Sequence, residues 1–146
     1  MSLEQISRIF PYKEIRDQQQ TAIEFIIDRF NAGKNIVILE AGTGVGKSAI
    51  AYAVSEYMRA YEVIRGDTPK GGNFLTTQKI LQQQYTRDFE SLGMNSIYSS
   101  TNYTCKFHKQ NTCAESSRLL RTSSKGEKFW NTCVMNCPYR KSKTKF

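Results

Sequence analysis

A glycine-rich segment, Ala41 to Ser48 with the sequence AGTGVGKS, constrains the fold more than any other part of the chain. It follows the apolar run NIVILE at residues 35–40, which predicts a short buried strand. It precedes apolar residues that recur at helical spacing from Lys47 to about Arg59. A strand, a glycine loop and a helix in this order indicate a P-loop, because glycines let successive backbone N–H groups turn toward phosphate oxygens. The segment fits the P-loop pattern except that Ala replaces the leading glycine.

The loop predicts a site for a nucleoside triphosphate and Mg²⁺. In such a site Lys47 reaches the β- and γ-phosphates, and the Ser48 hydroxyl ligates Mg²⁺. The backbone around the phosphates would come from Ala41, Gly42, Thr43, Gly44, Val45 and Gly46. The alternative is an ordinary glycine turn into a helix, and the Gly-Lys-Ser ending together with the strand-helix context argues against it.

A second helix is predicted upstream, from Arg16 to Phe30, and it begins with Arg16-Asp17-Gln18-Gln19. The amide of Gln19 can both donate and accept a hydrogen bond at an adenine edge, which would select ATP over GTP. Taken alone this signal is weak, because a Gln-rich helix start more often lies in solvent.

The rest of the first hundred residues continues the alternation of strands and helices. Phe74 to Thr76 predicts a second short strand, and apolar residues from Ile80 to Leu92 predict a further helix. Strands that alternate with helices are typical of a parallel α/β sheet. We therefore expect a P-loop α/β domain over residues 1–100.

Charge and cysteine content set the last part of the chain apart. Residues 1–104 hold 11 Lys and Arg and 11 Asp and Glu, whereas residues 105–146 hold 10 basic residues against two acidic ones, so the second segment carries the whole net charge of +8. The same segment holds all four cysteines, Cys105, Cys113, Cys133 and Cys137. In a cytosolic chain such cysteines indicate metal ligands rather than disulfides. We expect a second domain, mainly helical, over residues 101–146.

Taken in order, Arg16-x-x-Gln19, the EAGTGVGKS run from Glu40, the LTTQKILQQQYTRDF run from Leu75 and the four cysteines resemble the amino-terminal part of the XPD and DinG family of superfamily 2 DNA helicases. The resemblance implies a RecA-like sheet, adenine recognition by Arg16 and Gln19, and contact of Thr76–Gln78 with the DNA backbone. It also implies that Ala41 is a normal first residue of the loop. The four cysteines would ligate a 4Fe-4S cluster.

The spacing of the cysteines leaves the metal open. Cys105-x7-Cys113 and Cys133-x3-Cys137 lack the paired C-x2-C knuckles typical of zinc ribbons, and the Cys137-Pro138 pair is similar to the end of an iron-sulfur run. Zn²⁺ remains the alternative, followed by unligated cysteines in a core. His108 lies between two of the cysteines and is a possible substitute ligand, although a solvated loop residue is the simpler interpretation.

The basic segment predicts binding to single-stranded DNA, because cations follow phosphates and aromatic rings stack on bases. Its cations are Lys106, Lys109, Arg118, Arg121, Lys125, Lys128, Arg140, Lys141, Lys143 and Lys145, and its aromatic residues with the preceding tyrosine are Tyr103, Phe107, Phe129, Trp130 and Tyr139. For the individual rings, packing in a small domain is the stronger expectation.

Several classes of protein are disfavoured. The longest apolar run, Ala49 to Val54, is far shorter than the roughly 20 residues of a membrane helix, and no secretory signal opens the chain, so we expect a cytoplasmic protein without a membrane partner.

No apolar strand ends in Asp-Glu, the acid that holds Mg²⁺ in such motors. The chain therefore resembles the amino-terminal part of a longer ATP-dependent DNA helicase, running 5′ to 3′ by the resemblance and inactive as this piece alone. The alternatives are a zinc-stabilised, nucleotide-gated DNA-binding module without motor activity and, less favoured, a P-loop kinase.

Overall fold

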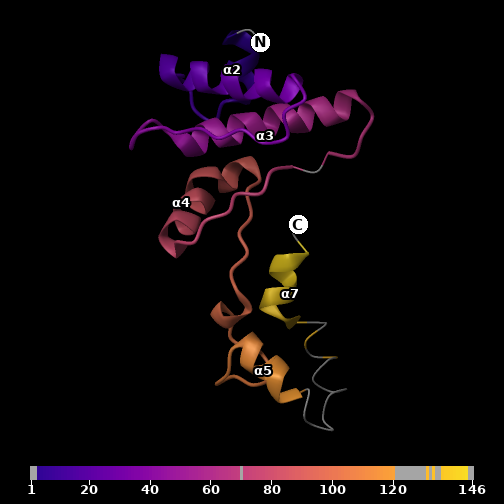
Figure 1. Ribbon diagram of the computed structural model, residues 1–146. Coiled ribbons are helices and arrows are strands. Elements are labelled where there is room, and N and C mark those ends of the chain that lie inside the picture. The colour runs from indigo at the N-terminus through magenta and orange to yellow at the C-terminus, as the bar shows by residue number, and fades with distance from the viewer. Residues whose placement is uncertain (1–2, 70, 121–130, 132, 134–135, 145–146) are drawn as a thin grey trace. The chain divides into compact units, whose positions relative to one another are not determined.

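The computed structural model describes residues 3–69, 71–120, 131, 133 and 136–144 (Figure 1). It divides the chain into two compact units, Met1–Thr77 and Gln78–Phe146. The helices of the first unit are α1 (Leu3–Ile9), α2 (Asp17–Asn31) and α3 (Lys47–Ile64). The second unit has α4 (Lys79–Phe89), the 3-10 turns η1 (Glu90–Leu92) and η2 (Ser100–Asn102), α5 (Cys113–Leu120) and α7 (Pro138–Lys143). The functional division near residue 100 stays a prediction.

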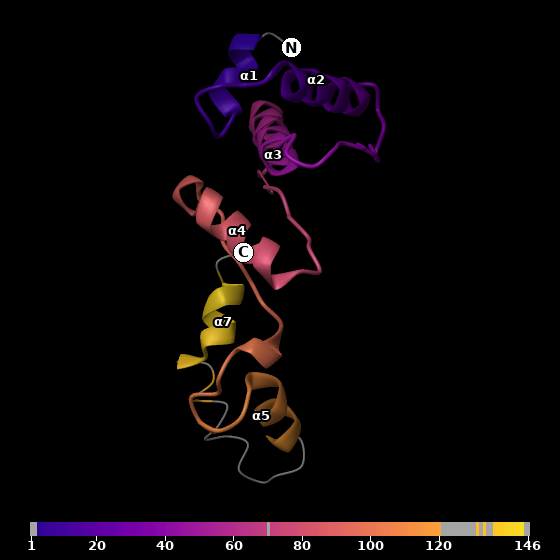
Figure 2. The same ribbon diagram turned by 90° about the vertical axis from the view of Figure 1, so that its left-hand side faces the viewer.

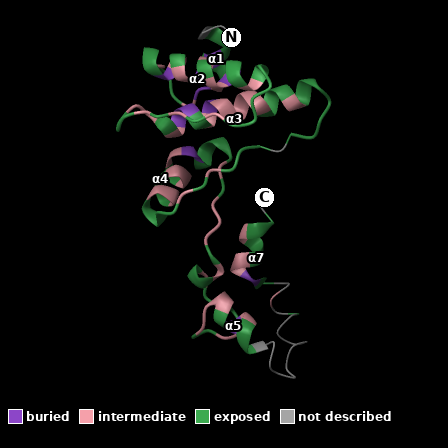
Figure 3. Cartoon of the chain, viewed as in Figure 1, coloured by how far each residue is buried: buried purple, intermediate pink, exposed green. Residues whose placement is uncertain are grey.

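The described part of the first unit is held together by the apolar faces of α1, α2 and α3. Figure 1 shows α2 and α3 side by side, and Figure 2 shows α1 next to them. The apolar residues of α2 at spacing four, Ile23 and Ile27, are buried, and α3 faces them with Ala49, Ile50 and Ala53. Two of these three are alanines, and their small side chains let the helices approach closely. The buried positions form the purple face between the helices in Figure 3.

The predicted helices are confirmed. The helix expected from Arg16 to Phe30 is α2, and it ends at Asn31, two residues before Gly33, whose φ is +79°. The helix expected from Lys47 is α3, which continues to Ile64 instead of ending near Arg59. The helix expected over residues 80–92 is α4 followed directly by η1.

The predicted parallel α/β sheet is wrong. Among the described residues the structure has no β-strand, and its one β-bridge, Thr104 with Thr112, is antiparallel and isolated. The expected strand at 35–40 is extended chain: Leu39 packs against the helical core, but Ile36 and Ile38 are 80% and 86% exposed. The expected strand at 74–76 is likewise unpaired, with Leu75 93% exposed.

The predicted sheet is wrong because an apolar pattern indicates burial of side chains and does not indicate pairing of the backbone. The apolar run at residues 35–40 predicts a buried segment, and the helical core buries only part of it here, through Leu39. A strand also needs a neighbouring backbone that exchanges hydrogen bonds with it. None of the described segments supplies that neighbour, so the pattern yields an extended segment lying on helices.

None of the helices in the described part of the chain is both long enough and apolar enough to cross a membrane.

Candidate functional site

The glycine loop leads directly into the first turn of α3. Gly44 and Gly46 have φ of +82° and +86°, the left-handed region that residues with a Cβ avoid. The carbonyl of Gly46 accepts the N–H groups of Ala49 (3.0 Å) and Ile50 (3.2 Å) and so starts the helix. The N–H groups of Lys47 and Ser48 lie in the first turn, where the helix itself provides no acceptor and an anion is favoured.

The start of α2 holds the same loop from the other side. The Arg16 guanidinium donates to the carbonyl of Gly44 (3.1 Å), and the Gln19 amide donates to the carbonyl of Val45 (2.8 Å). The Gln19 carbonyl oxygen accepts the backbone N–H of Arg16 (3.1 Å), which completes a cap at the start of α2. Gln19 is only 6% exposed. In this structure the two residues predicted to recognise adenine therefore hydrogen-bond the loop backbone.

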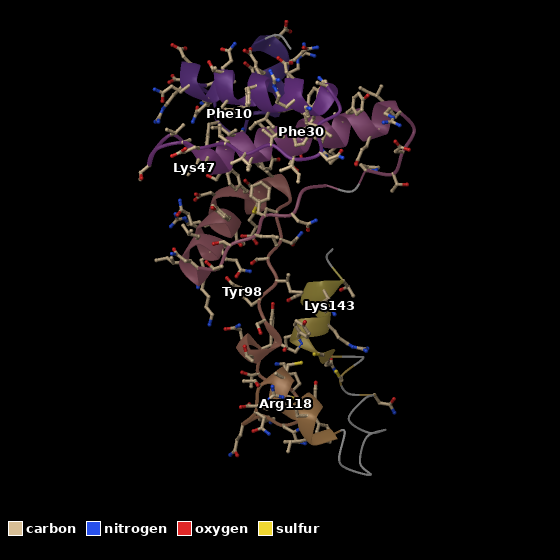
Figure 4. The ribbon with its side chains drawn as sticks, in the orientation of Figure 1. Phe10, Phe30, Lys47, Tyr98, Arg118 and Lys143 are labelled. Carbon is tan, nitrogen blue, oxygen red and sulfur yellow. The ribbon has the colours of Figure 1, made fainter. Side chains whose placement is uncertain are left out.

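The predicted phosphate ligands lie together at this loop. Lys47, labelled in Figure 4, donates from Nζ to the carbonyls of Ala41 (2.9 Å) and Gly42 (2.8 Å). Ser48 is half-buried in the first turn of α3, and Thr43 is exposed at the loop tip. The structure therefore brings Arg16 and Gln19 together with all of the loop residues.

The segment predicted to contact DNA, Thr76–Gln78, lies at the division between the two units. Gln78 has extended backbone (φ −102°, ψ 121°) and directly precedes α4. Thr76 is half-buried, whereas Thr77 and Gln78 are exposed.

In the second unit, Cys105 and Cys113 lie at the two ends of a narrow loop. The bridge between Thr104 and Thr112 closes this loop. The Cys105 N–H donates to the carbonyl of Asn111 (2.9 Å), and the sulfur of Cys105 accepts the backbone N–H of His108 (3.4 Å). The loop therefore fixes the backbone of both cysteines.

Cys113, Cys133 and Cys137 lie close to one another. The sulfurs of Cys113 and Cys137 are 4.0 Å apart. Burial and the neighbouring Cys137 raise the pKa of Cys113 to about 11, and burial and Cys137 also raise the pKa of Cys133. Burial opposes ionisation of Cys137 as well, but hydrogen bonds from the backbone N–H of Arg140 and from Cys133 outweigh it and lower the pKa of Cys137.

The chemistry of these thiols suits a thiolate-bound metal. Each of Cys113, Cys133 and Cys137 interacts with other cysteines, and Cys105 also acts on the pKa of Cys113 and Cys133. Within the described residues, however, no three His, Cys, Asp or Glu side chains lie in the arrangement that holds a metal ion. His108, the possible substitute ligand, does not complete such an arrangement with the described cysteines.

A pocket of about 390 Å³ borders the cysteines and carries positive charge. Its lining includes Cys113, Cys133 and Cys137 together with Arg118 of α5 and Arg140 and Lys143 of α7. Figure 4 labels Arg118 and Lys143 on their helices. No Asp or Glu is among the described residues that line it, so these three cations have no acidic neighbour within the pocket.

Of the other residues predicted to contact DNA, the described aromatic residues pack against other rings, the described lysines are exposed, and the rest lie outside the described residues. The Tyr103 and Tyr139 rings contact each other (5.4 Å between centroids), and the Phe107 ring contacts that of His108 (4.8 Å). Lys106, Lys109 and Lys141 are exposed. Outside the described residues lie Arg121, Lys125, Lys128, Phe129, Trp130 and Lys145.

Three residues with structural roles are missing from the sequence predictions. Thr112 and Glu115 form a capping box at the start of α5, in which Glu115 accepts the Thr112 N–H (2.7 Å) and hydroxyl (2.9 Å). The Thr112-x-x-Glu115 spacing is the recognised signal for such a cap. Gly72 lies where a Cβ would overlap the Ser55 hydroxyl of α3, a close approach that no local pattern announces.

Comparison with known proteins identifies one family. Residues 12–135 match the family described as "Type III restriction enzyme, res subunit", a match that spans most of the chain, from the segment before α2 to a point past Cys133, and that leaves Cys137 outside. Neither curated proteins nor solved structures give a match. The chain therefore belongs to the family of the type III restriction enzyme res subunit, whose domain is of the superfamily 2 helicase type.

Proposed function

We propose that this chain binds ATP with Mg²⁺ at the Ala41–Ser48 loop. The observation that carries the proposal is the loop's geometry: two left-handed glycines lead into α3, and Lys47 and Ser48 occupy the first two positions of that helix. There the helix N-terminus and the Lys47 ammonium both favour the phosphates. The Ser48 hydroxyl would supply an oxygen ligand to Mg²⁺.

Arg16 and Gln19 would act on nucleotide binding through the loop. Their hydrogen bonds to the carbonyls of Gly44 and Val45 fix the backbone that must surround the phosphates. Direct recognition of adenine by these two residues stays a prediction. The Gln19 amide keeps a second N–H and a second lone pair beyond its two present partners, and these would serve such a contact.

The activity we propose is that of the ATP-binding part of a DNA helicase. Membership of the res-subunit family supports a helicase-like, ATP-dependent role in general. The finer assignment, to an XPD- or DinG-like helicase that moves 5′ to 3′ on single-stranded DNA, rests on the sequence resemblance and on the cations of the second unit.

The four cysteines are proposed to hold a 4Fe-4S cluster, with Zn²⁺ as the alternative. Support comes from three described thiols lining one pocket without an acidic residue. A bound cluster would supply cross-links between distant parts of a small unit, and the protein's part is to present deprotonated thiolates. Because the pKa of Cys113 is raised to about 11, metal binding must displace its proton.

The nucleotide site is tested by calorimetric titration of the full chain with ATP and Mg²⁺. The Lys47→Ala variant should bind at least about tenfold more weakly, because it loses the ammonium that faces the phosphates. Lys34→Ala, which removes an exposed cation just before the extended segment, is the control and should bind like the parent chain. Equal affinity of the Lys47 variant and the parent would refute the site.

The metal is tested separately, by purification without oxygen followed by iron, sulfide and zinc analysis. About four iron and four sulfide per chain, with visible absorption, would support the cluster. One zinc per colourless chain would favour the zinc alternative, and no metal would refute both.

A further inference from the structure

Tyr103 contacts both sequence segments that carry the described cysteines of the second unit. Its carbonyl accepts the backbone N–H of Cys113 (2.8 Å), and its hydroxyl accepts the backbone N–H of Tyr98 (3.1 Å). Its ring lies against that of Tyr139, with the centroids 5.4 Å apart and the planes inclined by 51°. Tyr98 is labelled in Figure 4, in the segment that precedes η2.

On one side, Tyr103 belongs to the loop that carries Cys105 and Cys113. The Thr104–Thr112 bridge and the hydrogen bond from Cys113 hold the two ends of this loop together. These are backbone contacts, so they persist whatever side chain stands at position 103. What the side chain adds is its ring, which the Tyr98 N–H fixes at the hydroxyl end.

On the other side, the ring reaches the helix that begins at Cys137. Tyr139 is the second residue of α7, and its backbone N–H is one of the groups that hydrogen-bond the Cys137 sulfur. The Lys143 ammonium lies 5.4 Å from the centroid of the Tyr139 ring. The ring of Tyr139 is therefore in contact with both Tyr103 and Lys143.

We propose that Tyr103 is a positioning residue of the four-cysteine site: its ring, packed on Tyr139, holds Cys137 next to Cys113 before any metal binds. The inference rests on the proposed metal site for its purpose. The contact that it explains is the 4.0 Å approach of two sulfurs that lie 24 residues apart in sequence. Thiols held together in the metal-free chain need less ordering when a metal binds, and such preorganisation strengthens binding.

The first test uses the metal-free chain and measures the approach of the sulfurs directly. Mild oxidation with diamide converts two thiols to a disulfide, the two electrons and two protons passing to the diazene, and peptide mass spectrometry identifies the pair. In the parent chain Cys113–Cys137 should form fastest. Tyr103→Leu should slow that pair at least threefold while the far-ultraviolet circular dichroism stays native, and Tyr103→Phe, which keeps the ring, should stay within twofold of the parent.

Three further variants guard against a simple folding effect. Tyr139→Leu removes the same ring contact from the other side, so it should slow the pair as much as Tyr103→Leu does, and the double variant should be no slower than either. Tyr61→Leu on α3 in the first unit removes another partly exposed tyrosine and should change nothing. The proposal would be overturned if the rate of Cys113–Cys137 disulfide formation were unchanged in both Tyr103→Leu and Tyr139→Leu. It would also be overturned if Tyr103→Phe formed this disulfide as slowly as Tyr103→Leu.

The second test separates this inference from the metal site on which it rests. Cobalt(II) is titrated into each metal-free protein and followed through its thiolate absorption bands. Tyr103→Leu should bind cobalt at least threefold more weakly than Tyr103→Phe. If the parent chain binds no cobalt, the metal site is refuted, and the disulfide rates still decide whether Tyr103 positions the thiols. If the parent binds cobalt and the leucine variant binds equally well, the metal site stands and the role of Tyr103 is refuted.

Discussion

The contact between the glycine loop and α2 predicts that two glycines of similar conformation respond differently to alanine. Gly44 and Gly46 have nearly equal φ, +82° and +86°. A Cβ on Gly44 would meet nothing within 4 Å, whereas a Cβ on Gly46 would lie 2.5 Å from Nε2 of Gln19. Gly44→Ala therefore isolates the backbone strain, and Gly46→Ala adds a collision with a buried amide.

The magnitudes follow from these two terms. An alanine in the left-handed region costs about 1–2 kcal/mol, and this cost applies to both variants. In Gly46→Ala the Gln19 amide must also move and lose its 2.8 Å hydrogen bond to the Val45 carbonyl. Leaving a buried amide unsatisfied costs about 1–3 kcal/mol, so Gly46→Ala should be less stable than Gly44→Ala by about that amount. For a unit of this size each kcal/mol lowers the Tm by about 4–8 °C.

The assay is thermal unfolding followed by circular dichroism at 222 nm, without nucleotide, for both variants in the parent and in a Gln19→Ala background. Removing the Gln19 side chain removes the collision, so the difference between Gly46→Ala and Gly44→Ala should disappear in that background. Equal Tm values of the two variants in the parent chain would refute the reasoning. So would a difference that persists when Gln19 is alanine.

Three predictions concern the second unit. Thr112→Ala should destabilise that unit by about 1 kcal/mol in urea unfolding, since it removes the side-chain half of the cap on α5. The Thr112 N–H and hydroxyl lower the pKa of Glu115. The cap's contribution to the free energy of unfolding is therefore fully present above the unfolded pKa of about 4.3 and is lost as the pH falls through the lower folded pKa. Glu115→Gln should abolish this acid dependence, and an unchanged pH profile in that variant would contradict the prediction. Reversal of the three α7 cations to Glu should weaken binding to single-stranded DNA of every sequence in fluorescence anisotropy, and if about four phosphates are neutralised the parent's log K should fall with log salt at a slope near −3. A matched reversal of Lys13, Arg29 and Lys34 in the first unit should have a smaller effect, and equal losses would show that only net charge matters.

The helices and the shape of the glycine loop were predictable because their signals are local. Ile23 and Ile27 lie one turn apart, and the stop at Gly33 follows within a few residues, so α2 can be placed from neighbours alone. The same holds for the start of α3, where the order of glycines and Lys47 fixes the turn.

The sheet failed for the opposite reason, since a strand depends on a partner that the pattern does not name. Residues 35–40 have the side chains of a strand, but their backbone partner must come from elsewhere in the chain. The contacts of Gln19 were hidden in the same way. Its type predicts an amide that bonds something, and only the fold shows that the partners are the Val45 carbonyl and the Arg16 N–H.

The carbonyls of Ala41 and Gly42, which accept hydrogen bonds from Lys47, determine how strongly a ligand must attract the Lys47 ammonium in order to replace them. Ala41 and Gly42 offer neutral dipoles at 2.9 and 2.8 Å, so the ammonium already has good acceptors within its own loop. A ligand can draw the side chain away only by offering a stronger field, and a charged phosphate oxygen does so where a neutral sugar or base does not. At the proposed nucleotide site the loop would therefore favour strongly charged ligands, because a weakly charged ligand has to compete with backbone carbonyls that stay in place.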